Sequence, residues 1–352
     1  MHMADALLSP AVGGVMWAAT GATVAYSARR VREDLDESKI PLMGVAGAFV
    51  FAAQMVNFAI PGTGSSGHLG GALLLAILLG PEAAFLVMAS ILAVQALFFA
   101  DGGLLALGAN IFNLGFFPAF VAYPLVYRRI VGDGPELTRG RVVTGSVLAG
   151  IVGLQLGALG VVLETTASGV TELSFSAFLA FMLPIHLAIG VVEGLVTAAV
   201  VLFVHRTEPE LLERSAARRR LGGLRLRPVV VGLAVAALLA GGVLSWFASA
   251  HPDGLEWSIA KVTGTEQKPE TGSANGDIAA NAQEKAAVLP DDGVKDGDAQ
   301  EGAGGSAGDG GDSTAAGTSL AGVVGALIVL AVAGALGFAL RRRSAARAGS
   351  RA

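Results

Sequence analysis

Long runs of apolar residues, each about as long as a bilayer is thick, dominate this chain of 352 residues. The hydrocarbon core of a membrane takes roughly 20 apolar residues in a helix. Eight runs come near that length, and a shorter ninth run, 69–80, ends at Gly80-Pro81, where proline breaks a helix. The eight cover residues 10–28, 41–60, 84–100, 104–127, 142–163, 175–204, 229–249 and 320–340. The sequence therefore predicts an all-α integral membrane protein with a seven-span helical core plus a two-span C-terminal module.

Composition excludes several classes of protein. Only 15% of the residues are charged, against about 25% in an ordinary soluble domain. There is no cysteine, so disulfides and thiolate metal sites are excluded, and any metal must be held by nitrogen or oxygen. The phosphate loop G-x-x-x-x-G-K-[ST] is absent, as are G-x-S-x-G and H-E-x-x-H. We expect no enzyme, no resident cofactor and no nucleic-acid partner, because the arginines lie in short clusters between apolar runs.

The distribution of positive charge predicts the orientation. If the N-terminus is outside, 20 of the 24 Lys and Arg residues fall in inner segments, which agrees with the positive-inside rule. Without the short run 69–80, Arg128 and Arg129 would lie outside. We expect a multi-pass protein of the cell (inner) membrane with a cytoplasmic C-terminus. A cleaved signal peptide over the first 28 residues is the alternative, but Asp5 is their only charge, whereas a signal peptide begins with basic residues.

The composition also divides the chain into segments. Residues 262–319 carry 11 acidic residues and three lysines and almost no large apolar side chain, so this outer loop is expected to be disordered. The predicted segments are a seven-span core (1–205), a basic cytoplasmic linker (206–228), a two-span module (229–340) and a basic cytoplasmic tail (341–352).

The first residues, Met1-His2-Met3-Ala4-Asp5, predict a metal chelate. A bulky second residue protects Met1 from removal. The α-amine of Met1, the amide nitrogen of His2 and its imidazole Nδ1 can then hold one ion in fused rings, with three nitrogens in a plane. Planar nitrogen coordination suits Ni(II) or Cu(II), and low-spin Co(II) can adopt it.

His68 is the candidate for the fourth ligand. It follows the Gly-rich stretch Pro61-Gly-Thr-Gly-Ser-Ser-Gly67, which the predicted topology places on the same face as the N-terminus. Irregular backbone can enter the membrane where protein surrounds it. The alternative is that His2 is an exposed terminal residue and that His68 caps the next helix.

Two further features within the spans require interpretation. His186 and Glu193 are seven residues apart and share one face of a helix. They form either a second metal or proton site or a set of interhelical hydrogen bonds, and we favour the second interpretation. Gly14, Ala18 and Ala22 form a stripe of small residues that suits close helix packing, either within the bundle or against a coupling subunit. The polar amides within the spans are interpreted as structural.

Three motifs in this order resemble the CbiM/NikM family, the substrate-capturing membrane components of energy-coupling-factor transporters for cobalt and nickel. They are Met1-His2-Met-Ala-Asp-Ala-Leu-Leu-Ser9-Pro10, Gly67-His68-Leu-Gly-Gly-Ala-Leu, and His186-Leu-Ala-Ile-Gly-Val-Val-Glu193-Gly194. Residues 252–256, Pro-Asp-Gly-Leu-Glu, match the PDGLE signature of the NikN/CbiN-type accessory component. The chain thus resembles a fusion of the two components. Where many relatives have Ile-Pro-Asp-Gly, this chain has Met3-Ala4-Asp5-Ala6.

The resemblance implies a function and partners. In the family, the transported Ni(II) or Co(II) is held by the N-terminal amine, the amide and imidazole of the second residue and the His of the Gly-His motif, which here are Met1, His2 and His68. The expected partners are a CbiQ/NikQ-like transmembrane coupling protein and CbiO/NikO-like cytoplasmic ATPases. Two rival functions stay open: a self-sufficient secondary metal permease that uses His186 and Glu193, and a membrane metal sensor that does not transport.

Overall fold

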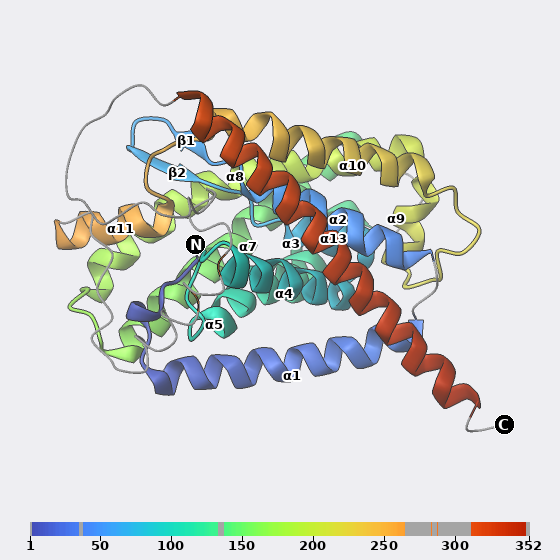
Figure 1. The fold of residues 1–352 in the computed structure, drawn as a ribbon, viewed down its shortest axis with the longest axis horizontal. Coiled ribbons are helices and arrows are strands. Elements are labelled where there is room, and N and C mark those ends of the chain that lie inside the picture. Colours follow the sequence, from blue (N-terminus) through green and yellow to red (C-terminus); the bar gives the residue numbers. More distant parts are fainter. Residues whose placement is uncertain are drawn as a thin grey trace.

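The computed structural model is a bundle of helices with one small hairpin (Figure 1). It describes residues 2–34, 38–132, 137–264, 283, 287 and 311–349. The elements, in chain order, are η1 (Asp5–Leu7), α1 (Pro10–Asp34), α2 (Lys39–Gln54), β1 (Phe58–Ile60), β2 (Ser65–Gly67), α3 (Ala72–Leu79), α4 (Pro81–Phe98), α5 (Leu107–Ile111), η2 (Phe112–Tyr127), α6 (Arg128–Val131), α7 (Arg139–Ser168), α8 (Phe175–Thr207), α9 (Pro209–Ala216), α10 (Arg227–Gly242), η3 (Leu244–Phe247), α11 (Gly254–Thr263) and α13 (Gly311–Gly349).

Five of the described helical segments are long and apolar enough to cross a membrane. They are α4, the continuous segment Leu107–Val131, α7, α8 and the stretch Ser319–Arg342 of α13. Two shorter apolar helices, α2 and α10, lie where spans are predicted, and α1 occupies the first predicted run. The fold is therefore a mainly helical, multi-pass membrane bundle, while the count of seven plus two spans stays a prediction.

The short run 69–80 is helical only over the eight residues of α3, Ala72–Leu79. A helix of that length rises about 12 Å and cannot cross the membrane by itself. Every residue of α3 is buried. At Gly80, with φ +82°, the chain leaves α3, and Pro81 begins α4. Residues 68–71 connect the hairpin to α3.

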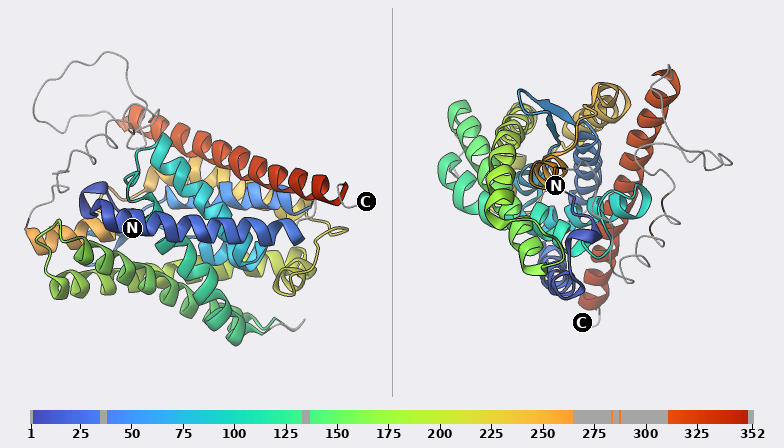
Figure 2. Two further views of the ribbon diagram at one scale, coloured as in Figure 1. Left: turned by 90° about the horizontal axis from the view of Figure 1, so that it is seen from below. Right: turned by 90° about the vertical axis from the view of Figure 1, so that its left-hand side faces the viewer.

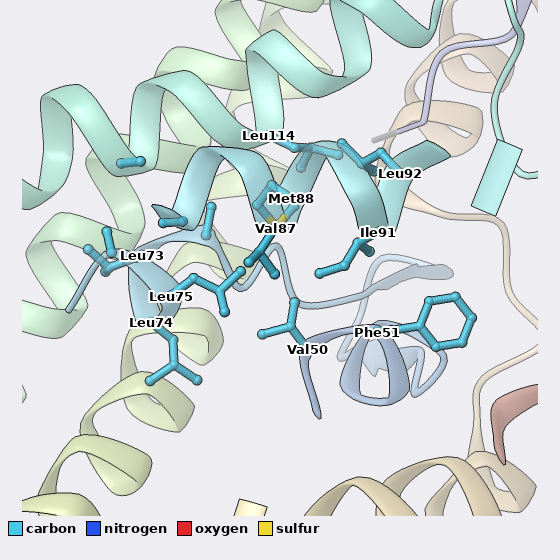
Figure 3. Packing of buried hydrophobic residues seen from close by; sticks show 14 of the residues in the cluster. Val50, Phe51, Leu73, Leu74, Leu75, Val87, Met88, Ile91, Leu92 and Leu114 are labelled. Atoms are coloured by element: carbon cyan, nitrogen blue, oxygen red, sulfur yellow. The ribbon is translucent and has the colours of Figure 1, made fainter. Parts of the chain in front are cut away.

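The apolar core surrounds α3. Leu73, Leu74 and Leu75 of α3 lie beside Val50 of α2 and Val87 of α4, as Figure 3 shows. Leu73 and Leu75 are wholly buried. Because water is excluded around α3, the loop that precedes it is held in a protein interior, where its backbone groups need partners in the protein.

The C-terminal module packs closely on the core. Helices α10 and α13 both lie along α2 (Figure 1). A Cβ built on Gly44 would lie 3.1 Å from the Leu330 carbonyl oxygen, and one on Gly47 would lie 3.3 Å from Val329 Cγ1. Such small-residue contacts let membrane helices approach closely. The two predicted segments of the chain therefore form one packed body.

The acidic outer loop 262–319 is shorter than predicted. Helix α11 extends to Thr263, and α13 begins at Gly311, so both ends of the segment are helical. The side chain of Gln283 is buried and donates to the carbonyl of Ala96 at 2.9 Å. The predicted disorder of the remaining residues lies outside the described part of the chain.

The two ends of the bundle differ in chemistry. The N-terminal segment, the hairpin and α11 lie at one end, and α9 and the C-terminus lie at the other (Figure 1). At the second end a surface pocket is lined by residues that include Arg30, Lys39 and Arg218. Arg218 of the predicted basic linker pairs with Glu82 at 2.9 Å, so part of this linker folds onto the core.

Candidate metal site

The first residues enter the bundle as a plug. Seen from the hairpin end, the start of the chain lies among the helices (Figure 2). The N–H of Met3 donates to Asn110 Oδ1 at 2.8 Å, and the Met3 carbonyl accepts from Asn110 Nδ2 at 3.2 Å and from the Gly103 N–H at 2.9 Å. Met3 is wholly buried, and Asp5 accepts from the Ala106 N–H at 2.9 Å. These bonds fix His2 at one position inside the protein.

His2 and His68 lie together. Their rings stack with centroids 5.0 Å apart and an interplanar angle of 17°. The His2 side chain is 7% exposed. Burial lowers the pKa of His2 to about 3, and burial likewise lowers the pKa of His68 to about 3. Both imidazoles are therefore neutral at neutral pH, and neutral imidazole is the form that binds metal.

The ring nitrogens of the two histidines have different partners. His68 Nδ1 lies 3.1 Å from the carbonyl of Leu69, so Nε2 is the candidate metal-binding atom of that ring. His2 Nδ1 lies 3.4 Å from Asp101 Oδ1, a polar contact, since the imidazole is neutral. His2 Nε2 is buried and finds no hydrogen-bond partner among the described residues. For the predicted chelate, Nδ1 must leave Asp101, which a half turn of the ring about its Cβ–Cγ bond achieves.

Glu193 holds the loop that follows His68. Its two carboxylate oxygens accept the N–H groups of Gly70 at 2.7 Å and Gly71 at 2.9 Å. Both backbone groups would otherwise be buried without partners, which costs about 1–3 kcal/mol each. Glycine is required here, because Gly71 has φ +80° and a Cβ on Gly67 would lie 2.5 Å from Ile189. Glu193 therefore positions the loop that carries His68.

Two buried glutamines hold the same loop from the side of α2 and α4. Gln54 Nε2 donates to the Gly70 carbonyl at 2.8 Å, and Gln95 Nε2 donates to Gln54 Oε1 at 2.9 Å. The amide network therefore links the loop that follows His68 to α2 and α4.

The two polar residues of α8 have separate partners. His186 Nδ1 lies 2.8 Å from the carbonyl of Met182, one turn earlier in the helix. Its ring lines a cavity of about 250 Å³ together with His68 and Asp253. Glu193 lies about two turns farther along the helix and contacts the amides of Gly70 and Gly71 instead. His186 and Glu193 thus both lie beside the loop that carries His68, but each has its own hydrogen-bond partners.

The small-residue stripe lies on the free face of α1. Gly14, Ala18 and Ala22 are exposed, and a Cβ built on Gly14 would meet no atom within 4 Å. The opposite face of α1 packs on α5, where Thr20 donates to the Gly108 carbonyl. The stripe therefore does not serve packing within the described part of the chain.

Some site residues were not predicted from the sequence. Asn110 was interpreted as structural, although it binds the backbone of Met3 on both sides. Asp101 and Asp253 were not singled out as site residues. Within the described ranges, no group of three or more His, Asp or Glu side chains gathers at metal-binding distance, and Met1 lies outside those ranges. Of the predicted ligands, the structure brings the imidazoles of His2 and His68 together.

Comparison with known proteins extends this result. The family model of the cobalt uptake substrate-specific transmembrane region, CbiM, matches residues 2–211, and that of the PDGLE domain matches residues 227–342. The chain is 34% identical over 346 residues to the NikMN protein of Archaeoglobus fulgidus, a match that covers 97% of this chain and 98% of that protein. It is 33% identical over 294 residues to the fused nickel transport protein NikMN of Rhodobacter capsulatus, covering 79% of this chain and 82% of the relative.

A solved structure of a truncated transition metal transporter shares the architecture. It is 33% identical, with a TM-score of 0.52, and the match covers 59% of this chain and 99% of the other. These relatives form a transport family and not an enzyme family. The chain belongs to the CbiM family, and it is a cobalt or nickel transport subunit of the CbiM/NikM kind that carries a PDGLE module in the same polypeptide.

Proposed function

We propose that this chain is the substrate-binding membrane subunit of an ATP-driven importer of the energy-coupling-factor type, and that it captures Ni(II) or Co(II) from outside. The stacked and neutral pair His2 and His68 is the observation that carries the proposal. This pair lies at the end of the bundle opposite the basic residues Arg30 and Arg218. If the basic end is cytoplasmic, as the positive-inside rule predicts, the pair faces outside.

The proposed ligands are four nitrogens. His68 Nε2 and His2 Nδ1 provide two, and the amide nitrogen of His2 and the amine of Met1 complete a plane. A square of nitrogen donors suits Ni(II) and Cu(II) better than an oxygen-preferring ion such as Mg²⁺.

The exposed face of α1 is the proposed contact for the coupling protein. Gly14, Ala18 and Ala22 would allow a CbiQ/NikQ-like helix to approach closely. ATP would be hydrolysed by separate CbiO/NikO-like subunits on the cytoplasmic side, since this chain carries no phosphate loop. The permease alternative needs His186 and Glu193 free for an ion, whereas Glu193 is bonded to two backbone amides.

Uptake of radioactive Ni(II) and Co(II) by whole cells tests the ATP-driven function. We expect uptake above background only when this chain is produced together with its coupling protein and active ATPases. Substitution of the phosphate-loop lysine in the ATPases should abolish uptake while this chain stays at the same level in the membrane. Uptake that persists with the inactive ATPases would show a secondary permease, and binding without uptake in any combination would show a sensor.

A further inference from the structure

The PDGLE segment (residues 252–256) packs against the hairpin that precedes His68. The N–H of Ser66 donates to the Pro252 carbonyl at 2.8 Å, and Ser66 pairs with Asp253 in a parallel β-bridge. Farther along the segment, the indole N–H of Trp257 donates to the Thr63 carbonyl at 3.0 Å. Ser66 lies two residues before His68, so these bonds fix the second module directly against the loop that carries the candidate ligand.

The carboxyl group of Asp253 lies at the site as a consequence. Asp253 lines the same cavity of about 250 Å³ as His68 and His186. Its Oδ1 accepts the N–H groups of Leu255 at 2.9 Å and Glu256 at 2.8 Å and so caps α11. A Cβ on Gly254 would lie 3.1 Å from His186 Cε1. Glycine at this position therefore allows the PDGLE segment to pack closely on α8.

A loaded site needs negative charge nearby. A divalent ion held by a neutral amine, two neutral imidazoles and one deprotonated amide keeps a net charge of about +1. Leaving one uncompensated charge away from water is costly, so buried charges are paired. Glu193 does not line the cavity that His68 and Asp253 share, and the Asp101 side chain is 46% exposed, so water screens it. Asp253, held in place by its cap geometry, is the carboxylate that lines this cavity.

We propose that Asp253 of the PDGLE module supplies the compensating negative charge of the loaded metal site, and that docking of this module thereby raises the affinity for the ion. The inference rests on the proposed binding of the ion at His2 and His68. By linkage, the bound ion strengthens docking of the module by the same factor that docking strengthens ion binding. An ion would then be retained while the module is docked and released more easily once Asp253 moves away.

The electrostatics of the metal-free protein agree with this role. Burial alone would raise the pKa of the Asp253 carboxyl, but the N–H of Glu256 is among the groups that outweigh burial and hold this pKa below its ordinary value. Asp253 is therefore a carboxylate at neutral pH, before any ion binds.

Asp253→Asn tests the negative charge of this side chain without removing its role as the N-cap of α11. Asparagine caps a helix as well as aspartate does, so the bonds to Leu255 and Glu256 are kept and only the negative charge is lost. We expect the affinity of the purified full chain for Ni(II) to fall about 10- to 100-fold, the range typical of groups that support metal ligands. The melting temperature of the metal-free protein should stay within about 2 °C of the native value.

The matched control is Glu256→Gln. It also removes one negative charge, three residues after Asp253, but the Glu256 side chain does not line the cavity. Its Ni(II) affinity should stay within about twofold of the native value. An unchanged affinity in Asp253→Asn, or an equal loss in both variants, would overturn the inference. If the native chain binds Ni(II) and loses it in His2→Gln while Asp253→Asn binds normally, the proposed function survives and this inference fails. If His2→Gln binds as the native chain does, the proposed site itself is wrong.

Discussion

His2→Gln is expected to lower the Ni(II) affinity of the full chain by more than about 100-fold, because supporting groups alone account for 10- to 100-fold and this change removes a ligand. Glutamine is chosen since a bulky second residue keeps Met1 in place. The amide of Gln cannot replace imidazole Nδ1 in the fused chelate rings. Mass spectrometry of the metal content and titration with Ni(II) and Co(II) in parallel would measure the change, and the better-retained ion is the expected cargo.

The matched control for this substitution is His251→Gln. His251 belongs to the same end of the molecule, and its side chain is exposed. Its carbonyl, which accepts from Ser66 Oγ at 2.8 Å, is unaffected by a side-chain change. We expect one bound equivalent in the control. Equal binding by native chain and His2→Gln would mean that the ion is held elsewhere, with His186 and its neighbours as the next candidates.

Glu193→Gln is expected to weaken Ni(II) binding about 10- to 100-fold although every proposed ligand remains. A carboxylate offers two acceptor oxygens, whereas the amide of Gln offers one. Either the Gly70 or the Gly71 N–H would therefore be left buried without an acceptor, and the loop that carries His68 would move. Isothermal titration in detergent or in nanodiscs would measure the affinity, and whole-cell uptake would show the same direction.

Glu164→Gln serves as the comparison for Glu193→Gln. Glu164 is also buried, and it accepts from Asn113 Nδ2 at 2.8 Å, away from the His68 loop. Its substitution should change stability but leave Ni(II) affinity within about twofold. If Glu193→Gln binds Ni(II) normally yet abolishes uptake, Glu193 has a role in the passage of the ion and the permease interpretation gains support.

The helical spans could be predicted because their cause is local. A run of about 20 apolar residues has few stable forms in a bilayer other than a helix, and α7 and α8 lie over the predicted runs 142–163 and 175–204 with longer ends. The short hairpin of β1 and β2 was not predicted. Its residues, from Phe58 to Gly67, include Gly and Ser without the alternation that indicates a strand.

The histidines of the site could also be predicted, because chelate chemistry singles out His2 and the Gly-rich loop singles out His68. The groups that position them could not. Asn110 is 107 residues from Met3 and Glu193 is 123 residues from Gly70, and nothing in a single sequence indicates which polar residues meet. The sequence indicates Asp253 only as part of the Pro-Asp-Gly-Leu-Glu motif. Its place beside His68 follows from its β-bridge with Ser66.

X-ray absorption at the nickel edge of the native chain, loaded with one equivalent of Ni(II), tests the central claim most directly. The proposed site predicts four nitrogen donors in a plane, with the scattering signature of imidazole, and loss of this spectrum in His2→Gln. Six donors, mainly oxygen, in an octahedral arrangement would contradict capture of the ion at Met1, His2 and His68.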